Sequence, residues 1–92
     1  MKGVTKWEDV SFVIASSYRT KILEWLKTPK EPSILSKETG INKTHISRGL
    51  KELEEKKIVK CLSPNAKKGK LYVISDYGKR VLEEALKIRR EK

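Results

Sequence analysis

The chain of 92 residues carries 22 Lys and Arg against 12 Asp and Glu, and its formal net charge of +10 favours a polyanionic partner, such as nucleic acid or an acidic membrane surface. Its length allows one small domain, residues 1–92, and leaves no room for a separate catalytic or ligand-binding domain. One cysteine and one histidine exclude an internal disulfide framework and a Cys/His zinc cluster, so we expect no metal and no cofactor.

The basic residues are concentrated in two segments that contain no acidic residue. Residues 39–51 carry three Lys or Arg, and residues 56–75 carry six. These segments account for nine of the ten net charges, because the rest of the chain has 13 basic groups against all 12 acidic ones. Neither segment has the flanking apolar patch that a membrane-surface helix would need.

The N-terminal sequence, MKGVTKWEDVSF, lacks the apolar core of a secretory signal. No apolar run approaches the length needed to span a bilayer. We therefore expect a cytoplasmic protein with no membrane partner.

The first predicted helix begins near Lys6, because Thr5 and Glu8 have the spacing of a capping box. In such a box each side chain satisfies a backbone N–H at the helix start. The apolar residues that follow can belong to the core or can pair with a second subunit. They are Trp7, Val10, Phe12, Val13 and Ile14.

Ser16 and Ser17 offer a break and a cap for a second helix. Pro29 and Pro32 stop that helix and rigidify the connection to a short third helix, which Ser33 can cap. The apolar face of the second helix is predicted to contain Ile22, Trp25 and Leu26.

Gly40 occupies the position where a helix commonly ends in the left-handed conformation, and Asn42 can cap a fourth helix two residues later. So short a turn requires the third and fourth helices to cross at a steep angle. Ile46, Leu50 and Leu53 share one face of the fourth helix, since they fall at i, i+4 and i+7.

The opposite face of the fourth helix carries Thr44, Arg48 and Lys51, with Ser47 and His45 on the two flanks. Short hydrogen-bonding groups and cations without acids favour contact with DNA. The alternative is a solvated helix face. A catalytic triad is disfavoured, because the only histidine would lie on this exposed helix.

Gly49 interrupts this helix at a cost of about 1 kcal/mol relative to Ala. It lies near the edge of the apolar stripe. A close crossing of two helices is the favoured explanation. The alternative is a close approach of the backbone to DNA or to a partner.

The runs IVKCL and LYVIS are rich in β-forming residues and predict a hairpin. The intervening SPNAKKGK is longer than the usual two to five residues of a hairpin loop, and such long tips tend to be functional or disordered. Ser75 and Asp76 then open a last helix, whose apolar side contains Val81, Leu82, Ala85, Leu86 and Ile88.

The segment PSILSKETGINKTHISRGLKELEEKKIVK resembles the helix-turn-helix and first wing strand of winged-helix transcription regulators, especially arsenical-resistance-type and multiple-antibiotic-resistance-type repressors. YVISDYGKRVLEEAL is similar to the strand and helix that follow the wing in those families. The resemblance covers about residues 16–86. It implies an α+β, mainly α, winged helix-turn-helix fold, with the helix-turn-helix at about 33–57, the wing at about 58–74 and a C-terminal helix at about 75–90.

The resemblance also implies a homodimer formed through the N- and C-terminal helices and bound to double-stranded DNA. Its two recognition helices would lie about 34 Å apart and recognise an inverted repeat. Its recognition positions fall on Lys43, Thr44, His45, Ser47 and Arg48, with Lys51 near phosphate, and Asn42 is also expected to contact DNA. Its wing-tip positions fall on Asn65, Lys67, Lys68 and Lys70. An exposed lysine loop can also serve solubility alone.

Two departures from the family pattern argue against a metal or small-molecule inducer. The metal-binding Cys pair of the arsenical type is absent, and the chain is shorter than the antibiotic-resistance type. We expect a sequence-specific DNA-binding transcription regulator, a repressor in preference to an activator, and not an enzyme. The alternative is a winged-helix adaptor that binds protein, RNA or any nucleic acid in a replication or transcription complex.

Overall fold

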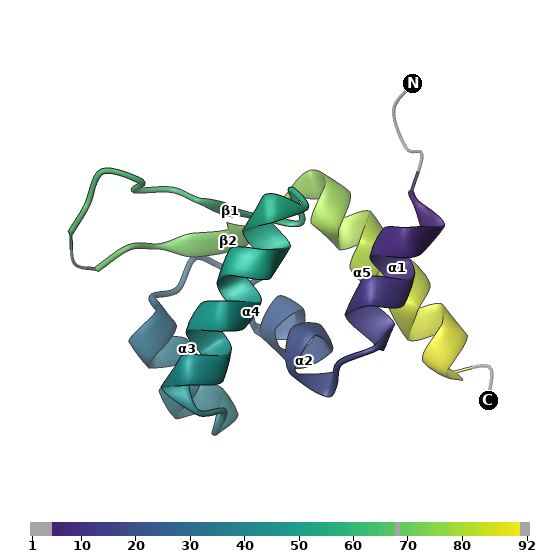
Figure 1. Cartoon of the computed structure of the whole chain (residues 1–92), viewed down its shortest axis with the longest axis horizontal. Coiled ribbons are helices and arrows are strands. Elements are labelled where there is room, and N and C mark those ends of the chain that lie inside the picture. The colour runs from purple at the N-terminus through teal and green to yellow at the C-terminus, as the bar shows by residue number, and fades with distance from the viewer. Residues whose placement is uncertain (1–4, 68, 91–92) are drawn as a thin grey trace.

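A computed structural model describes residues 5–67 and 69–90. The described residues form five helices and one antiparallel hairpin (Figure 1). This order confirms the predicted winged helix-turn-helix, in which α3, a short turn and α4 precede the hairpin. The elements are α1 (Trp7–Ile14), α2 (Ser17–Trp25), α3 (Pro32–Thr39), α4 (Lys43–Glu55), β1 (Val59–Cys61), β2 (Tyr72–Ile74) and α5 (Asp76–Arg90).

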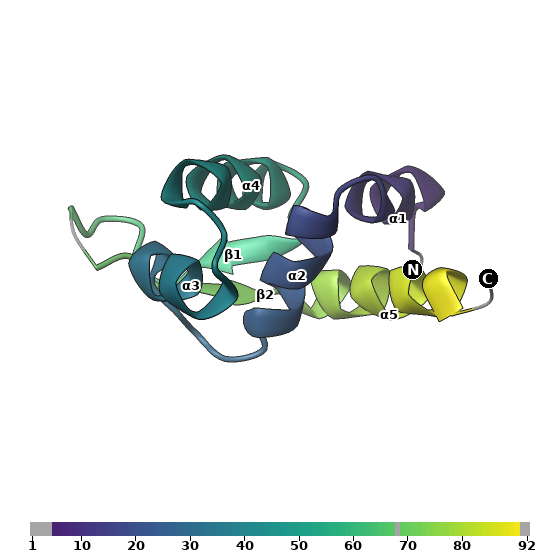
Figure 2. The same ribbon diagram turned by 90° about the horizontal axis from the view of Figure 1, so that it is seen from below.

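The molecule is flat, with principal extents of 38 × 31 × 18 Å. In Figure 2, α4 and α1 lie on one broad face, α5 lies towards the other, and α2 and the strands of the hairpin lie between them. The hairpin projects from one end, whereas α1 and the end of α5 lie at the opposite end (Figure 1). No helix in the described part of the chain is both long enough and apolar enough to cross a bilayer.

The apolar stripe of α4 is buried as predicted. Ile46, Leu50 and Leu53 are almost fully excluded from solvent and pack against α2 and α3. Burial of a Leu or Ile side chain stabilises the fold by roughly 1.5–3 kcal/mol. The stripe therefore fixes which side of α4 faces outward.

Two predicted caps and the predicted turn are confirmed. The Ser16 Oγ accepts a hydrogen bond from the Arg19 N–H at 3.4 Å. The Asn42 Oδ1 accepts one from the Thr44 N–H at 2.8 Å. Gly40 ends α3 with a φ of 76°, in the left-handed region that glycine adopts without a steric penalty.

Two other predicted caps are wrong. Lys6, not Thr5, is the N-cap of α1, so the box with Glu8 does not form. Ser33 lies inside α3, which begins one residue earlier at Pro32. Proline suits the first helical position, because its missing N–H has no partner there in any helix.

Trp25 does not belong to the buried face of α2, as the sequence predicted, and is 39% exposed. Leu23 is buried in its place, together with Ile22 and Leu26. At about 100° per residue, including Leu23 shifts the centre of the stripe away from Trp25. The indole is therefore left on the flank of the helix.

The base of the hairpin is held on both sides of β2. β1 pairs with one edge in the register Val59↔Ile74, and Lys30 from the α2–α3 connection forms a bridge to Tyr72 on the other. The Leu62 N–H donates to the Leu71 carbonyl at 2.7 Å, beyond the strands themselves. The long tip therefore projects from an anchored base.

Ser75 caps α5, as predicted, because its Oγ accepts a hydrogen bond from the Gly78 N–H at 2.9 Å. A Cβ at Gly78 would collide with the carbonyl oxygen of Ile58. Glycine at this position therefore allows the start of α5 to pack against the backbone that follows α4.

Candidate nucleic-acid interface

The predicted major-groove residues all lie on the solvent-exposed side of α4 and its N-cap. This side faces away from the Ile46, Leu50 and Leu53 stripe. Within the described residues, neither Arg48 nor any lysine of this face forms an ion pair with an acidic side chain. The exposed residues are Asn42, Lys43, Thr44, His45, Ser47, Arg48 and Lys51.

Two of these side chains have structural contacts as well. The Asn42 Oδ1 is occupied by the cap of α4, which leaves its amide N–H groups for other partners. The His45 ring stacks on Tyr18 of α2, with ring centroids 4.7 Å apart and an interplanar angle of 20°. Tyr18 was not predicted as part of this face.

The hairpin tip brings the second basic segment to the start of α4. Lys43 of α4 and Lys67 and Lys70 of the tip line one open hollow of about 340 Å³ beside the first turn of α3. Glu31 lies on the same hollow and introduces a carboxylate that the sequence pattern did not reveal. Two acid-free segments that are separate in the sequence thus meet at one surface.

The remaining predicted tip residues are not all described. Asn65 is exposed near the end of the hairpin. Lys68 lies outside the described residues. The described tip cations are therefore Lys67, which is exposed, and Lys70, which is half-buried.

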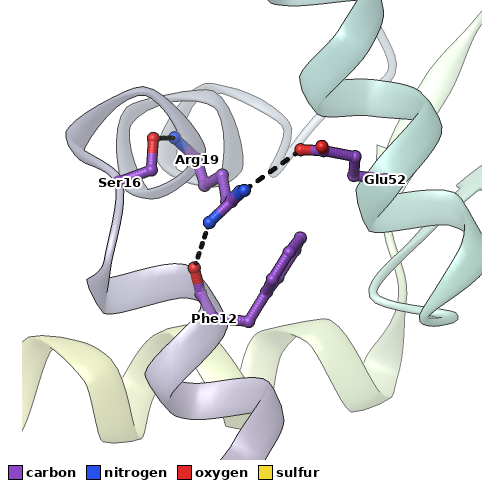
Figure 3. Close-up of polar contacts among 4 residues, drawn as sticks. All are labelled: Phe12, Ser16, Arg19 and Glu52. Carbon is purple, nitrogen blue, oxygen red and sulfur yellow. Dashed lines mark hydrogen bonds and ion pairs between the residues drawn. The ribbon is translucent and has the colours of Figure 1, made fainter.

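Arg19 connects three helices behind this face (Figure 3). One guanidinium nitrogen donates to the Phe12 carbonyl at 2.8 Å, and the other forms an ion pair with Glu52 at 3.2 Å. The guanidinium carbon also lies 3.7 Å from the centroid of the Phe12 ring, as in a cation–π contact. No local pattern predicts this role, because the partners lie seven and 33 residues away.

A second polar contact joins α1, α4 and α5. Asp9 is almost fully buried, and its carboxylate accepts a hydrogen bond from the Tyr77 hydroxyl. Lys56, which caps the C-terminus of α4, places its ammonium 3.6 Å from the same carboxylate. A buried carboxylate needs such partners, because an unpaired charge would be costly to remove from water.

Gly49 permits the close approach of α4 to α2. A Cβ at this position would lie 2.9 Å from the Cδ1 of the fully buried Ile22. This contact supports the favoured explanation of the glycine, a close helix crossing. The cost of glycine in a helix interior is therefore offset by packing.

The arrangement suits recognition of an anion more than bond-making chemistry. Its exposed groups are hydrogen-bond donors and cations, which complement phosphate oxygens and the acceptor edges of bases. Among the described residues, no three His, Cys, Asp or Glu side chains form a group that could hold a metal ion.

Comparisons with known proteins show the fold. No protein-family model and no curated protein sequence matches the chain. The transcriptional regulator BldR from Sulfolobus solfataricus superposes with a TM-score of 0.74 at 19% identity, covering 91% of this chain and 66% of BldR. A mutant of the Escherichia coli MarR, solved with operator DNA, superposes with a TM-score of 0.69 at 21% identity, covering 87% of this chain and 62% of MarR.

A third similar structure is nearly as short as this chain. It is the homodimeric winged helix-turn-helix DNA-binding domain of a possible ArsR-family regulator from Mycobacterium bovis. The TM-score is 0.73 at 20% identity, and the match covers 99% of this chain and 92% of that domain. By contrast, this chain spans less than two thirds of BldR and MarR.

Proposed function

We propose that this chain is a sequence-specific transcription regulator that binds double-stranded DNA, with α4 in the major groove and the hairpin on the backbone or minor groove. The observation that carries the proposal is the meeting of two acid-free segments at one surface. Lys43 of α4 and Lys67 and Lys70 of the hairpin line the same hollow, next to the exposed polar face of α4. Regulators of this fold also appear among the similar structures.

The exposed face of α4 supports direct contact with bases. The major groove accommodates one α-helix, and its base edges offer acceptors to Arg, Lys, Ser and Asn. Arg48 is exposed on this face and can donate two hydrogen bonds to guanine O6 and N7. The proposed regulator acts by occupying promoter DNA, most simply as a repressor, and not as an enzyme.

We also propose a homodimer formed through α1 and α5. These helices pack together at the end of the molecule opposite the hairpin, which leaves α4 accessible (Figure 1). Trp7 of α1 is 66% exposed, so its indole is available to pack against a second copy of the chain. Sedimentation equilibrium at tens of micromolar tests this part, near the range of weak dimers. A purely monomeric protein would refute it.

The central experiment is the selection of bound duplexes from a random DNA pool. We expect one consensus, arranged as an inverted repeat with half-sites about one helical turn apart. Salt-sensitive binding to every duplex with no consensus would contradict sequence-specific regulation. That outcome would favour the adaptor that binds any nucleic acid.

The hairpin lysines give a separate test of backbone contact. Replacing Lys67 and Lys70 together by Ala is expected to reduce the steepness of the log–log salt dependence of affinity by about 0.9 for each phosphate that is no longer neutralised. The base preference should persist, because phosphate contacts carry no sequence information. Lys79→Ala with Lys87→Ala removes the same charge from α5 and should leave the slope nearly unchanged.

A further inference from the structure

The stacked pair of Tyr18 and His45 joins the first turns of α2 and α4 at the molecular surface. The centroid distance of 4.7 Å and the angle of 20° agree with an offset aromatic stack. Tyr18 remains 45% exposed, and His45 is exposed too. The stack therefore orients the imidazole without burying it.

The helix that carries Tyr18 is firmly held. Ser16 caps its first turn, and the neighbouring Arg19 is bound to the Phe12 carbonyl and to Glu52 (Figure 3). Gly49 lets α2 and α4 approach closely one turn further along. Tyr18 is thus a fixed surface against which the His45 ring rests.

His45 and Arg48 share one ridge of α4, on the side that faces α2, because they are three residues apart. Both line a shallow hollow of about 290 Å³, together with Tyr18 and Glu52. Glu52 is occupied by Arg19, whereas Arg48 forms no ion pair with any described residue. A stacked imidazole and a guanidinium with no acidic partner are therefore adjacent at the outer surface.

We propose that Tyr18 is a positioning residue for DNA recognition: its ring holds the His45 imidazole in one orientation, so that His45 presents a fixed ring N–H to one base edge beside the base pair contacted by Arg48. This inference rests on the proposed DNA-binding function. A side chain that is ordered before binding loses less conformational freedom in the complex. A fixed ring also favours one base over the others, since it cannot turn to meet a different donor and acceptor pattern.

Replacing Tyr18 by Leu removes the stack and keeps an apolar side chain. We expect the affinity for the selected duplex to fall roughly two- to tenfold, the cost of ordering one free side chain. The base preference at one position of the consensus should weaken. The salt dependence should not change, because the substitution removes no cation from the surface.

Four further variants separate positioning from a general structural effect. Tyr18→Phe keeps the ring and should restore both affinity and base preference. His45→Ala should weaken the same base position, and the double variant with Tyr18→Leu should lose no more than His45→Ala alone. Trp25→Leu removes an exposed aromatic ring from the other end of α2 and should leave the consensus intact.

Proton NMR of the free protein tests the stack without DNA. The His45 imidazole resonances should shift in Tyr18→Leu, since the ring current of Tyr18 is lost, and should stay near their original positions in Tyr18→Phe. An unchanged consensus in Tyr18→Leu would overturn the positioning role and leave the proposed function standing. Equal losses in Tyr18→Leu and Tyr18→Phe would also overturn it, because the ring alone would then be insufficient. Failure of the wild type to yield a consensus would overturn both proposals.

Discussion

The two halves of α4 differ in what their polar side chains contact. In residues 43–48, Lys43 and Arg48 form no ion pair within the described part of the chain. In the second half, Glu52 pairs with Arg19, and Lys56 at the C-cap pairs with the buried Asp9. One end of the helix is therefore bound to α1 and α2, and the other leaves its cations available to a partner.

This difference shows how a small domain can hold an exposed helix rigidly. The second half of α4 with its C-cap Lys56, here called the bound half, supplies the ion pairs that hold α4 against α1 and α2. The Ile46, Leu50 and Leu53 stripe runs through both halves and buries one side throughout. The polar side chains of the first turns are therefore not needed for the core and can face a partner. Substitutions of buried or ion-paired residues should change the free energy of unfolding, whereas substitutions of the exposed polar residues should change DNA binding.

The largest expected effect comes from Leu50, at the centre of the stripe. Leu50→Ala should lower the free energy of unfolding by about 2–5 kcal/mol, because it removes a buried side chain and leaves a cavity. The adjacent Lys51→Ala should change it by less than about 0.5 kcal/mol, since Lys51 is exposed. Urea unfolding of both variants measures the difference. Equal losses would contradict the division between buried and exposed sides.

Arg48→Ala should change DNA recognition and not stability, the reverse of Leu50→Ala. It should remove about 1–3 kcal/mol of discrimination at one base pair, roughly 5–150-fold, and leave the unfolding free energy nearly unchanged. Competition binding with single-base variants of the selected duplex measures this effect. Arg80→Ala removes the same charge from α5, outside the proposed DNA-contacting surface, and is the control that should leave the base discrimination unchanged. A uniform loss in Arg48→Ala would assign Arg48 to the backbone instead.

Periodicity and capping residues predicted those parts of the scaffold that depend on local sequence alone. The spacing of Ile46, Leu50 and Leu53 identified the buried side of α4. Gly40 and Asn42 located the turn before it, because each has a local conformational or hydrogen-bonding role. Local signals were less reliable where two neighbouring residues could take the same role. Leu23 and not Trp25 is buried in α2, and Lys6 and not Thr5 is the N-cap of α1.

The contacts of the bound half were not predictable from the sequence. The hydrogen bond between Arg19 and Glu52 joins residues 33 apart, and the one between Asp9 and Tyr77 joins residues 68 apart. Helical spacing shows which face of a helix is polar but not which other helix lies beside it. The stack of Tyr18 on His45 was not predictable for the same reason.

Tyr77 of α5 and Lys56 at the end of α4 both bind the carboxylate of Asp9 in α1, so a change at Tyr77 tests how much this shared contact stabilises the fold. Tyr77→Phe should cost about 1.5 kcal/mol near neutral pH, because Asp9 loses a hydrogen-bond donor and keeps only Lys56. Burial, and then the hydrogen bond to Asp9, raise the pKa of Tyr77 above its ordinary value of 10.0. The folded protein therefore retains the phenol proton at pH values where the unfolded chain loses it.

The sign of the pH dependence follows from that shift. The contribution of the protonated Tyr77 to the free energy of unfolding is fully present below the ordinary tyrosine pKa. It is lost as pH rises through the raised pKa of the folded protein. The stability gap between wild type and Tyr77→Phe should thus narrow between neutral pH and about pH 11. Urea unfolding at both pH values measures it. A gap that widens with pH would show that Tyr77 is stabilised as the phenolate.

The smallest expected effect concerns Glu52, whose exposure of 37% weakens its ion pair with Arg19. Glu52→Gln should lower the unfolding free energy by about 0.2–1 kcal/mol. Glu55→Gln removes the same charge from an exposed position of α4 and should cost less, because Glu55 forms no ion pair with a described residue. Both variants should strengthen binding to any duplex equally, since each removes one negative charge near the phosphates. A loss of base preference in Glu52→Gln alone would show instead that the bound half also fixes the orientation of the first turns.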